Sequence, residues 1–255
     1  MGAGHSHPLY LNGTSVLHRA RPQCKLAAGL LFVLAVVATP REAIWAYGLY
    51  GLLLVGLARL GRAPLPFLAR RLVIELPFLL FALFLPLVGQ GERVEVIGVP
   101  LAREGLWAAW NIVVKGTLGV AASVIVAATT PVPELLQGLE RLRLPRAFTT
   151  IAGFMVRYAD VIADEVRRMR IARISRGHDP RWIWQARAVA AAAGTLFIRS
   201  YERGERVYLA MVSRGYAGSM PVLHELAASR RQWLAAMAVP AAAALVAATA
   251  WGIRP

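Results

Sequence analysis

The sequence predicts an all-α integral membrane protein, and its composition and charge carry that prediction. Hydrophobic residues make up 57% of the 255 residues and the mean hydropathy is +0.52, which excludes a disordered chain. Only 17% of the residues are charged, against about 25% in a typical soluble domain. A net charge of +15 in so apolar a chain indicates a cationic membrane face, with the lipid bilayer and not nucleic acid as partner. Cys24 is the only cysteine, so an intrachain disulfide scaffold is excluded.

Five apolar segments are expected to cross the bilayer, since a helical span needs roughly 20 apolar residues and at least about 17. They are residues 26–39, 43–58, 76–90, 106–130 and 233–252. The first segment is short, and it spans only if Lys25 lies in the headgroup layer and extends its ammonium group to the membrane surface. Pro77 and Pro86 are expected to kink the third segment.

The loops that join these segments alternate between many and few positively charged residues. The longest loop, residues 131–232, holds 17 arginines and nine acidic residues, a net of +8. The positive-inside rule then places the N-terminus and this loop in the cytoplasm and the C-terminus outside. We therefore expect three parts: residues 1–130 with the first four spans, residues 131–232 as a cytoplasmic helical domain, and residues 233–255 with the fifth span.

The cytoplasmic segment is expected to contain one short helix and two long helices. The short amphipathic helix covers residues 134–144 and is stopped by Pro145. From Arg146 to about Ser175, apolar residues recur at steps of three and four, the period of an amphipathic helix. The second long helix is expected over residues 182–213.

The two long helices are expected to end alike, at Ser175-Arg176-Gly177 and at Ser213-Arg214-Gly215. Glycine is a common helix C-cap, and a cation in the last turn is favoured by about 0.3–1 kcal/mol, so either ending alone reads as a helix stop. Two copies, 38 residues apart at the ends of consecutive long helices, indicate a functional pair instead.

With these residues the chain resembles the transmembrane coupling subunit of energy-coupling-factor transporters, the EcfT family, and looks most similar to its cobalt-type branch, CbiQ. The family's signature is a pair of Ala-Arg-Gly-like motifs, and both copies here have serine in place of alanine while keeping Arg176 and Arg214. The likeness covers nearly the whole chain. It also rests on Ser15-Val-Leu-His18-Arg19 with Pro22 and Lys25, Thr130-Pro131, Glu134-Leu135, Leu139, Leu144-Pro145, Arg157-Tyr158, Glu165, Arg168-Met169 and Ala172-Arg173.

This resemblance implies a subunit that has no ATPase activity and binds no cofactor of its own. It would link two cytoplasmic ABC ATPases, which hold ATP and Mg²⁺, to a substrate-binding membrane subunit, either CbiM-like or a vitamin S component. The two long helices would cross and form a coupling domain with the short one, and their arginine tips would dock into grooves on the ATPases. The implied setting is the cell (inner) membrane of a bacterium or archaeon, and the implied function is uptake of cobalt or nickel.

The leading site candidates under this resemblance are the two tips themselves. Three further arginines lie within a turn or two of them, and docking support and a solvated helix face are equally good interpretations: Arg170, Arg173 and Arg206. Glu165 is expected to form an ordinary surface pair with Arg168 or Arg170.

Lys115 lies inside the fourth apolar segment, and an intramembrane cation is a functional candidate by default. The alternatives are that it faces a polar groove, pairs with Glu75 of the third segment, or extends towards the membrane surface. His5, His7 and His18 invite a metal site, but His5 and His7 alone supply two ligands on a terminal segment, too few for a defined site, so none is expected.

Catalysis is not expected of this chain. The run Lys115-Gly116-Thr117 has the wrong order for a P-loop, and neither His-Glu-x-x-His nor Gly-x-Ser-x-Gly occurs. Two transport alternatives stay open beside cobalt or nickel uptake. One is a coupling subunit that serves vitamin uptake. The other is a conventional ABC permease or a secondary carrier, against which the absence of an internal repeat argues.

Overall fold

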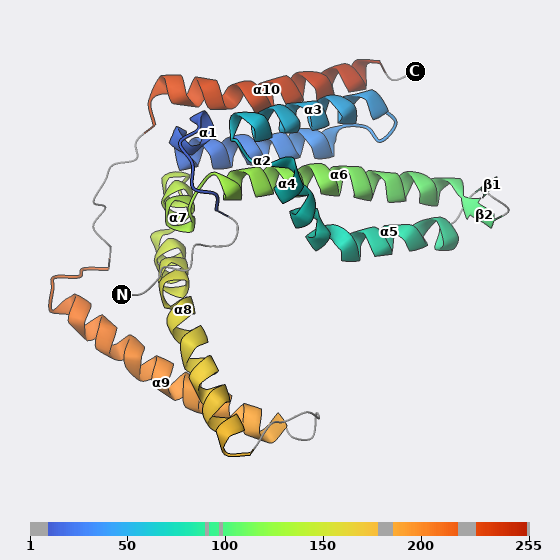
Figure 1. The fold of residues 1–255 in the computed structure, drawn as a ribbon. Coiled ribbons are helices and arrows are strands. Elements are labelled where there is room, and N and C mark those ends of the chain that lie inside the picture. Colours follow the sequence, from blue (N-terminus) through green and yellow to red (C-terminus); the bar gives the residue numbers. More distant parts are fainter. Residues whose placement is uncertain (1–9, 90–91, 97–98, 178–185, 219–227, 254–255) are drawn as a thin grey trace. The chain divides into compact units, whose positions relative to one another are not determined.

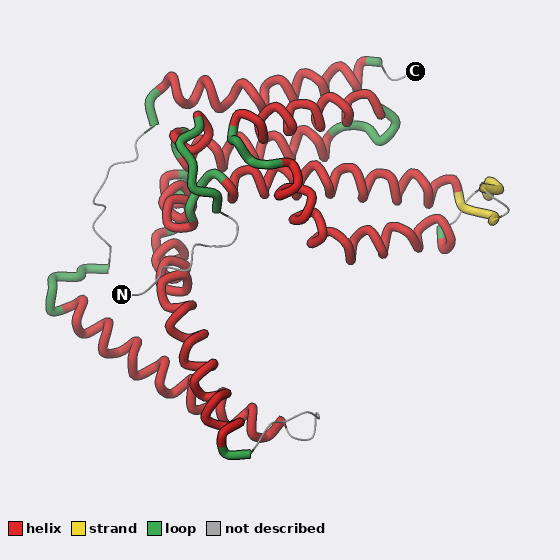
Figure 2. Tube along the Cα trace, viewed as in Figure 1, coloured by secondary structure: helices red, strands yellow, loops and turns green. Residues whose placement is uncertain are grey.

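The computed structural model describes residues 10–89, 92–96, 99–177, 186–218 and 228–253. The chain divides into two compact units, each of which is described by itself. The larger unit is formed by residues 6–142 and 226–255, and the smaller by residues 143–225 with residues 1–5. Helices dominate both units, as expected for an all-α membrane protein (Figures 1 and 2).

The larger unit is a layer of long apolar helices packed side by side (Figure 1). Helix α10 packs on α2 and α3, α2 packs on α6, and α6 packs on α5. The helices of this unit are α1 (Val16–Arg19), α2 (Pro22–Ala38), α3 (Ile44–Leu60), α4 (Leu65–Arg71), the 3₁₀ turn η1 (Leu72–Glu75), α5 (Leu76–Val88), α6 (Arg103–Ala128), α7 (Val132–Arg141) and α10 (Arg230–Gly252).

Three helical stretches of the larger unit are long and apolar enough to cross a membrane. They are Leu65–Val88, Arg103–Ala128 and Arg230–Gly252, whereas α2 and α3 are shorter apolar helices of 17 residues each. The first of these stretches begins at Leu65, eleven residues earlier than the sequence suggested. Arg70 and Arg71 do not end the helix, because the chain continues through a 3₁₀ turn and Pro77 lies at the start of α5, where proline is tolerated.

The helices α5 and α6 approach each other closely at Gly105, in the first turn of α6. A Cβ atom placed on this glycine would lie 2.4 Å from the carbonyl oxygen of Leu85 and 2.8 Å from the Cα of Pro86. Both neighbours are backbone atoms of α5, so only a residue without a side chain fits there. A short hairpin of β1 (Arg93–Val96) and β2 (Val99–Ala102), which the sequence did not indicate, joins the two helices.

Tyr50 fixes the core between α2, α3 and α10. Its side chain is fully buried, and its ring packs edge-on against Phe32 of α2 at 5.8 Å between centroids. The hydroxyl group donates to the carbonyl of Ala243 in α10 at 3.2 Å and lies 2.8 Å from the hydroxyl of Thr39. One side chain of α3 thereby ties together the first and the last apolar helix of the unit.

The carbonyl groups at the C-terminal end of α2 are capped by side chains of α6 and α10 and by the C-cap residue Thr39. The ammonium group of Lys115 in α6 donates to the carbonyl of Val37 at 2.8 Å. The indole N–H of Trp251 in α10 donates to the carbonyl of Ala38 at 2.9 Å. The Thr39 hydroxyl donates to Ala35, also at 2.8 Å. The acceptors that a helix end leaves unsatisfied are therefore occupied without water.

The smaller unit contains two long helices, α8 (Arg146–Ser175) and α9 (Ala186–Val212). At 1.5 Å per residue their 30 and 27 residues correspond to about 45 and 40 Å. The bounds of α8 match the sequence prediction, because Pro145 precedes the helix and Gly177 follows its end. The short helix α7 packs against α2 in the larger unit, so the smaller unit begins near Arg143 and not at residue 131.

Candidate functional site

The end of α8 forms the first of the two arginine tips. Ser175 is the last helical residue, and Arg176 is the C-cap. Gly177 follows with a φ of +76°, a left-handed conformation that favours glycine, and its N–H donates to the carbonyl of Ile174 at 2.9 Å. The Ser175 hydroxyl donates to the carbonyl of Ile171 at 3.0 Å. The serine is thus turned back onto its own helix, and the arginine is left at the tip.

The end of α9 is built in a similar way, although this helix ends one residue earlier in the motif, at Val212, just before Ser213. Gly215 has a φ of +84°, and its N–H donates to the carbonyl of Val212 at 2.9 Å. The Ser213 hydroxyl donates to the carbonyl of Ala210 at 3.0 Å. Arg214 therefore precedes a left-handed glycine at its tip, as Arg176 does on α8. The two endings that share a sequence pattern also share a local structure.

Both tip arginines are exposed. Within the described residues, no carboxylate forms an ion pair with Arg176 or Arg214. Figure 1 shows that α8 and α9 cross and then diverge, so that their C-terminal ends lie apart. The smaller unit consequently presents two separate cationic points and not one combined site.

Glu165 joins the two helices where they cross. Its carboxylate accepts hydrogen bonds from Arg168 of α8 at 2.8 Å and from Arg199 of α9 at 2.5 Å. These two bonds, that to Arg168 foremost, lower the pKa of Glu165 below its usual value. The predicted surface pair with Arg168 is confirmed. The bond to Arg199 was missed, because no pattern within a single helix indicates a contact between helices.

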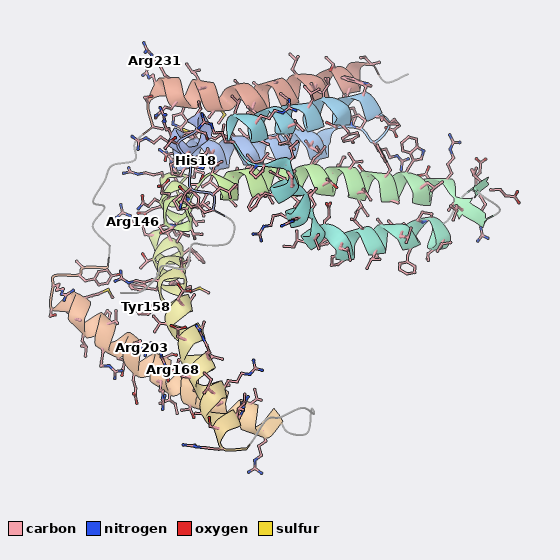
Figure 3. The ribbon with its side chains drawn as sticks, viewed as in Figure 1. His18, Arg146, Tyr158, Arg168, Arg203 and Arg231 are labelled. Carbon is pink, nitrogen blue, oxygen red and sulfur yellow. The ribbon has the colours of Figure 1, made fainter. Side chains whose placement is uncertain are left out.

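An apolar cleft of about 370 Å³ lies between α8 and α9. Tyr158 stacks on Phe154 with 6.3 Å between ring centroids, and both side chains line this cleft from α8. Tyr208 and Arg203 line it from α9; Figure 3 labels Tyr158 and Arg203 on the two helices. Several large apolar side chains of the pair are exposed, and they include Phe148, Ile151, Met155, Phe197, Tyr201 and Leu209. The helix pair therefore exposes more apolar surface than is usual for helices that only water surrounds.

The three flanking arginines differ in their surroundings. Arg206 lies 3.9 Å from Glu202 one turn earlier on α9, as in a solvated helix face. Arg170 is exposed. Arg173 is half-buried, and its Nε finds no acceptor among the residues that the structure describes. A docking role for these three residues stays a prediction.

The two intramembrane polar groups are held separately. Lys115 reaches the end of α2, as described above, and does not reach Glu75. The Glu75 carboxylate is buried and accepts a hydrogen bond from the hydroxyl of Thr117 at 3.0 Å. The pairing of Lys115 with Glu75 that the sequence left open is thus replaced by two bonds to other groups.

Lys25 is also placed differently from the sequence prediction. Its side chain is 8% exposed, and its ammonium group donates to the carbonyl of Thr129 at 3.0 Å. It does not extend towards headgroups, because the end of α6 offers unpaired carbonyl groups and the negative end of a helix dipole. Lys25 on α2 and Lys115 on α6 thus each cap the end of the other's helix.

His18 has a structural role. Its Nε2 donates to the carbonyl of Leu11 at 2.8 Å, and its Nδ1 lies 2.7 Å from the Ser15 hydroxyl, which caps α1 (Figure 3). His5 and His7 lie outside the described residues. In the described ranges, no three His, Cys, Asp or Glu side chains come together in a way that would hold a metal ion.

Comparison with known proteins relates the chain to transporter subunits. The model of the CbiQ family, described as cobalt transport protein, matches residues 13–224. The energy-coupling factor transporter transmembrane protein EcfT of Bacillus selenitireducens is 28% identical over 229 residues, 82% of each chain. The cobalt transport protein CbiQ of Rhodobacter capsulatus is 31% identical over 163 residues, which cover 64% of this chain and 65% of that protein.

A longer relative contains this kind of chain as one part. The putative fused cobalt transport protein CbiMQ of Methanocorpusculum labreanum is 29% identical over 150 residues, which cover 56% of this chain and 25% of that protein. The apolar helices, the paired arginine tips and these relatives agree on a transmembrane component of an energy-coupling-factor type transporter. Since the family model matches most of the sequence, the chain belongs to the CbiQ family of cobalt transport proteins.

Proposed function

We propose that this chain couples ATP hydrolysis by two cytoplasmic ABC ATPases to uptake of cobalt or nickel through a separate substrate-binding membrane subunit. The observation that carries the proposal is the matched pair of helix ends, each presenting one exposed arginine beside a left-handed glycine. A guanidinium group on a rigid helix end suits bidentate pairing with a carboxylate in a groove of a partner. Arg176 and Arg214 would each contact one ATPase. ATP and Mg²⁺ would be held by those partners and no cofactor by this chain.

The geometry of α8 and α9 suits the transmission of movement. The two tips are separated, so one ATPase can engage each of them, and the helices are joined at Glu165 and Arg199. Closure of the ATPases around ATP would displace the tips, and helices of about 45 and 40 Å would carry that displacement as rods. The exposed apolar side chains of the pair supply a surface for the substrate-binding subunit.

The proposed topology has five spans with the N-terminus in the cytoplasm. The three long apolar stretches supply three spans, and α2 and α3 supply two short ones. The side chains that cap the end of α2 support a short span, because the carbonyl groups of Val37 and Ala38 then need no water as donor. Arginine-rich loops then fall on the cytoplasmic side.

The substrate assignment rests on the family and on the named relatives. The CbiQ and CbiMQ relatives are cobalt transport proteins by name, and the fused protein suggests a CbiM-like partner for this chain. A second candidate is a coupling subunit that serves vitamin-binding S components. It is favoured by the EcfT relative, because that match covers 82% of this chain, against 64% for the CbiQ relative.

The proposal is tested by affinity purification of the tagged chain from its own membranes, with mass spectrometry of the chains that co-purify. We expect one or two ABC ATPases and a small apolar membrane subunit, whose identity separates metal from vitamin uptake. The double variant Arg176→Ala/Arg214→Ala should lose the ATPases and keep the membrane subunit. The matched control Arg167→Ala/Arg187→Ala removes two other exposed arginines of the same helices and should keep both. Full ATPase recovery with the tip variant would contradict the proposal.

A further inference from the structure

The larger unit contains a cleft of about 510 Å³ that the proposed coupling role does not use. Helices α1, α2, α3, α6 and α10 border the cleft, and most of its lining side chains are apolar. Phe32, Leu54 and Val239 reach it from α2, α3 and α10. Its volume falls within the range of about 300–1,000 Å³ that is typical of sites for small molecules.

One end of the cleft is cationic. Arg19, Arg21 and Lys25 line it there. The ammonium group of Lys25 is already bonded to a carbonyl oxygen of the chain, as described above. Arg19 donates from Nε to the carbonyl of Thr14 at 3.1 Å, and in the described part of the chain neither arginine forms an ion pair with a carboxylate. Two guanidinium groups are therefore left to attract an anion.

From this cationic end the cleft extends along α2. Arg21 is the N-cap of α2, and the lining of the cleft continues through Gly29 to Phe32. Phe32 lies eleven positions after Arg21, which corresponds to about 16 Å along the helix. The Thr129 hydroxyl in this wall is already bonded to the carbonyl of Ile125 at 2.9 Å. The deep part of the cleft thus suits an apolar chain, since a polar ligand group would be left unpaired there.

We propose that this cleft binds one anionic phospholipid, with the headgroup phosphate on Arg19 and Arg21 and an acyl chain between α2, α3 and α10. The charge at one end and the apolar length beyond it match the two parts of such a lipid. Basic pockets between membrane helices are known to take anionic headgroups. The surrounding helices lie in a membrane, so the lipid is already at hand. Phosphate by itself would leave the apolar length unfilled.

The test titrates the full-length chain, purified with the subunits that remain bound to it, and counts bound lipids by native mass spectrometry. Phosphatidylglycerol is compared with phosphatidylcholine. Arg19→Gln/Arg21→Gln removes the headgroup contacts, and Ala236→Phe fills the apolar part, where Ala236 lines the cleft. The matched control Arg59→Gln/Arg62→Gln removes two exposed arginines that do not line the cleft. Gel filtration and thermal unfolding check that each variant is folded.

We expect one phosphatidylglycerol per chain, bound at least tenfold more tightly than phosphatidylcholine. The Arg19→Gln/Arg21→Gln variant should bind it about 30-fold more weakly, as the loss of two headgroup cations implies, and the control pair should bind as the wild type does. Ala236→Phe should abolish stoichiometric binding. The proposal is overturned if both lipids bind alike, if the control pair weakens binding equally, or if folded Ala236→Phe keeps the lipid. Displacement of the lipid by inorganic phosphate at millimolar concentration would also overturn it, since it would indicate an anion site only.

Discussion

The larger unit and the helix pair α8–α9 both expose large apolar side chains, but the two surfaces differ in the charged residues beside these side chains. In the larger unit, exposed residues such as Phe78 and Leu83 of α5 lie on a helix without a charged residue. In the helix pair, exposed residues such as Met155 and Leu209 alternate with arginines and acids. The first surface suits lipid, and the second suits proteins that supply both apolar and charged groups. Exposure alone therefore does not identify the neighbour, whereas the charges beside it do.

The cationic side chains also differ between the larger unit and the helix pair. In the larger unit, Lys25 and Lys115 are bonded to carbonyl groups of neighbouring helices. In the helix pair, the tip arginines are left without an ion pair among the described residues. The larger unit bonds these two lysines internally, and the helix pair leaves its two tip cations for partners.

The largest effect is expected where two backbones touch in the larger unit. Gly105→Ala would place a Cβ 2.4 Å from the Leu85 carbonyl oxygen, so α5 and α6 must separate. We expect a loss of about 3 kcal/mol or more in the free energy of unfolding, at the upper end of overpacking effects. Thermal unfolding in detergent measures it. Gly119→Ala, on the same helix with open space at the Cβ, is the control and should be neutral. Equal stability of the two variants would contradict this close packing.

The next prediction compares the stability that Lys25 and Lys115 contribute, because these two lysines differ in burial. Lys25→Met leaves a buried carbonyl of Thr129 unpaired, and we expect a loss of about 2 kcal/mol in the free energy of unfolding. Lys115→Met removes a bond of a half-buried side chain to the exposed residue Val37, and the loss should stay below about 1 kcal/mol. Thermal unfolding of both variants in one lipid mixture checks the order. A reversed order would show that burial does not set the value of these bonds.

A smaller effect is expected at the crossing of α8 and α9, and it depends on pH. The pKa of Glu165 is lowered in the folded state, so its contribution is fully present above its unfolded pKa of about 4.3. The contribution is lost as the pH falls through the lower folded-state value. Glu165→Gln should mimic the acid state at neutral pH.

Distances between spin labels at residues 157 and 205 report on this crossing. The distribution should broaden in Glu165→Gln, and in the wild type once the pH falls through the lowered pKa of Glu165. Asp164→Asn removes a pair with Arg167 on the same helix and should leave the distribution narrow. If the distance distribution broadened only in Asp164→Asn, contacts other than those of Glu165 would hold the two helices together at the crossing.

The smallest effect is expected at the tip serines. Both hydroxyl groups bond to their own helices, so Ser175→Ala/Ser213→Ala should change stability by less than about 0.5 kcal/mol per site and keep ATPase binding. Gly177→Ala provides the contrast, because a left-handed φ of +76° makes alanine less stable there by about 1 kcal/mol. Circular dichroism and pull-down of the ATPases measure the two effects. A serine variant that lost the ATPases would give the hydroxyl groups a direct contact.

The sequence predicted those helix ends that a proline, a glycine or a repeated motif marks locally. Pro145 and Gly177 bound α8, and the repeated Ser-Arg-Gly run indicated two equivalent tips. It failed where an interaction joins distant segments. The bond from Arg199 to Glu165 spans 34 residues, and the bond from Lys25 to Thr129 spans 104. Neither side chain differs, in its local sequence, from one that faces solvent or headgroups.

The start of the third span was misplaced for a different reason. Arg70 and Arg71 look like the end of a loop, yet α4 and η1 continue the helical path through them into α5. Charge marks the membrane surface in sequence, but it does not stop a helix, and only proline or a capping glycine does so strongly.

The bonds that the last helix makes to the first have a consequence for biosynthesis. Trp251 and the carbonyl of Ala243 belong to α10, which leaves the ribosome long after α2 and α3, and they complete the partners of Ala38 and Tyr50. Until then the carbonyl of Ala38 at the end of α2 and the hydroxyl of Tyr50 in α3 lack these partners. Helix α2 is thus fixed by these bonds only after α10 has been made. A quality-control protease that senses exposed polar groups in membrane helices would recognise a chain that stops before α10.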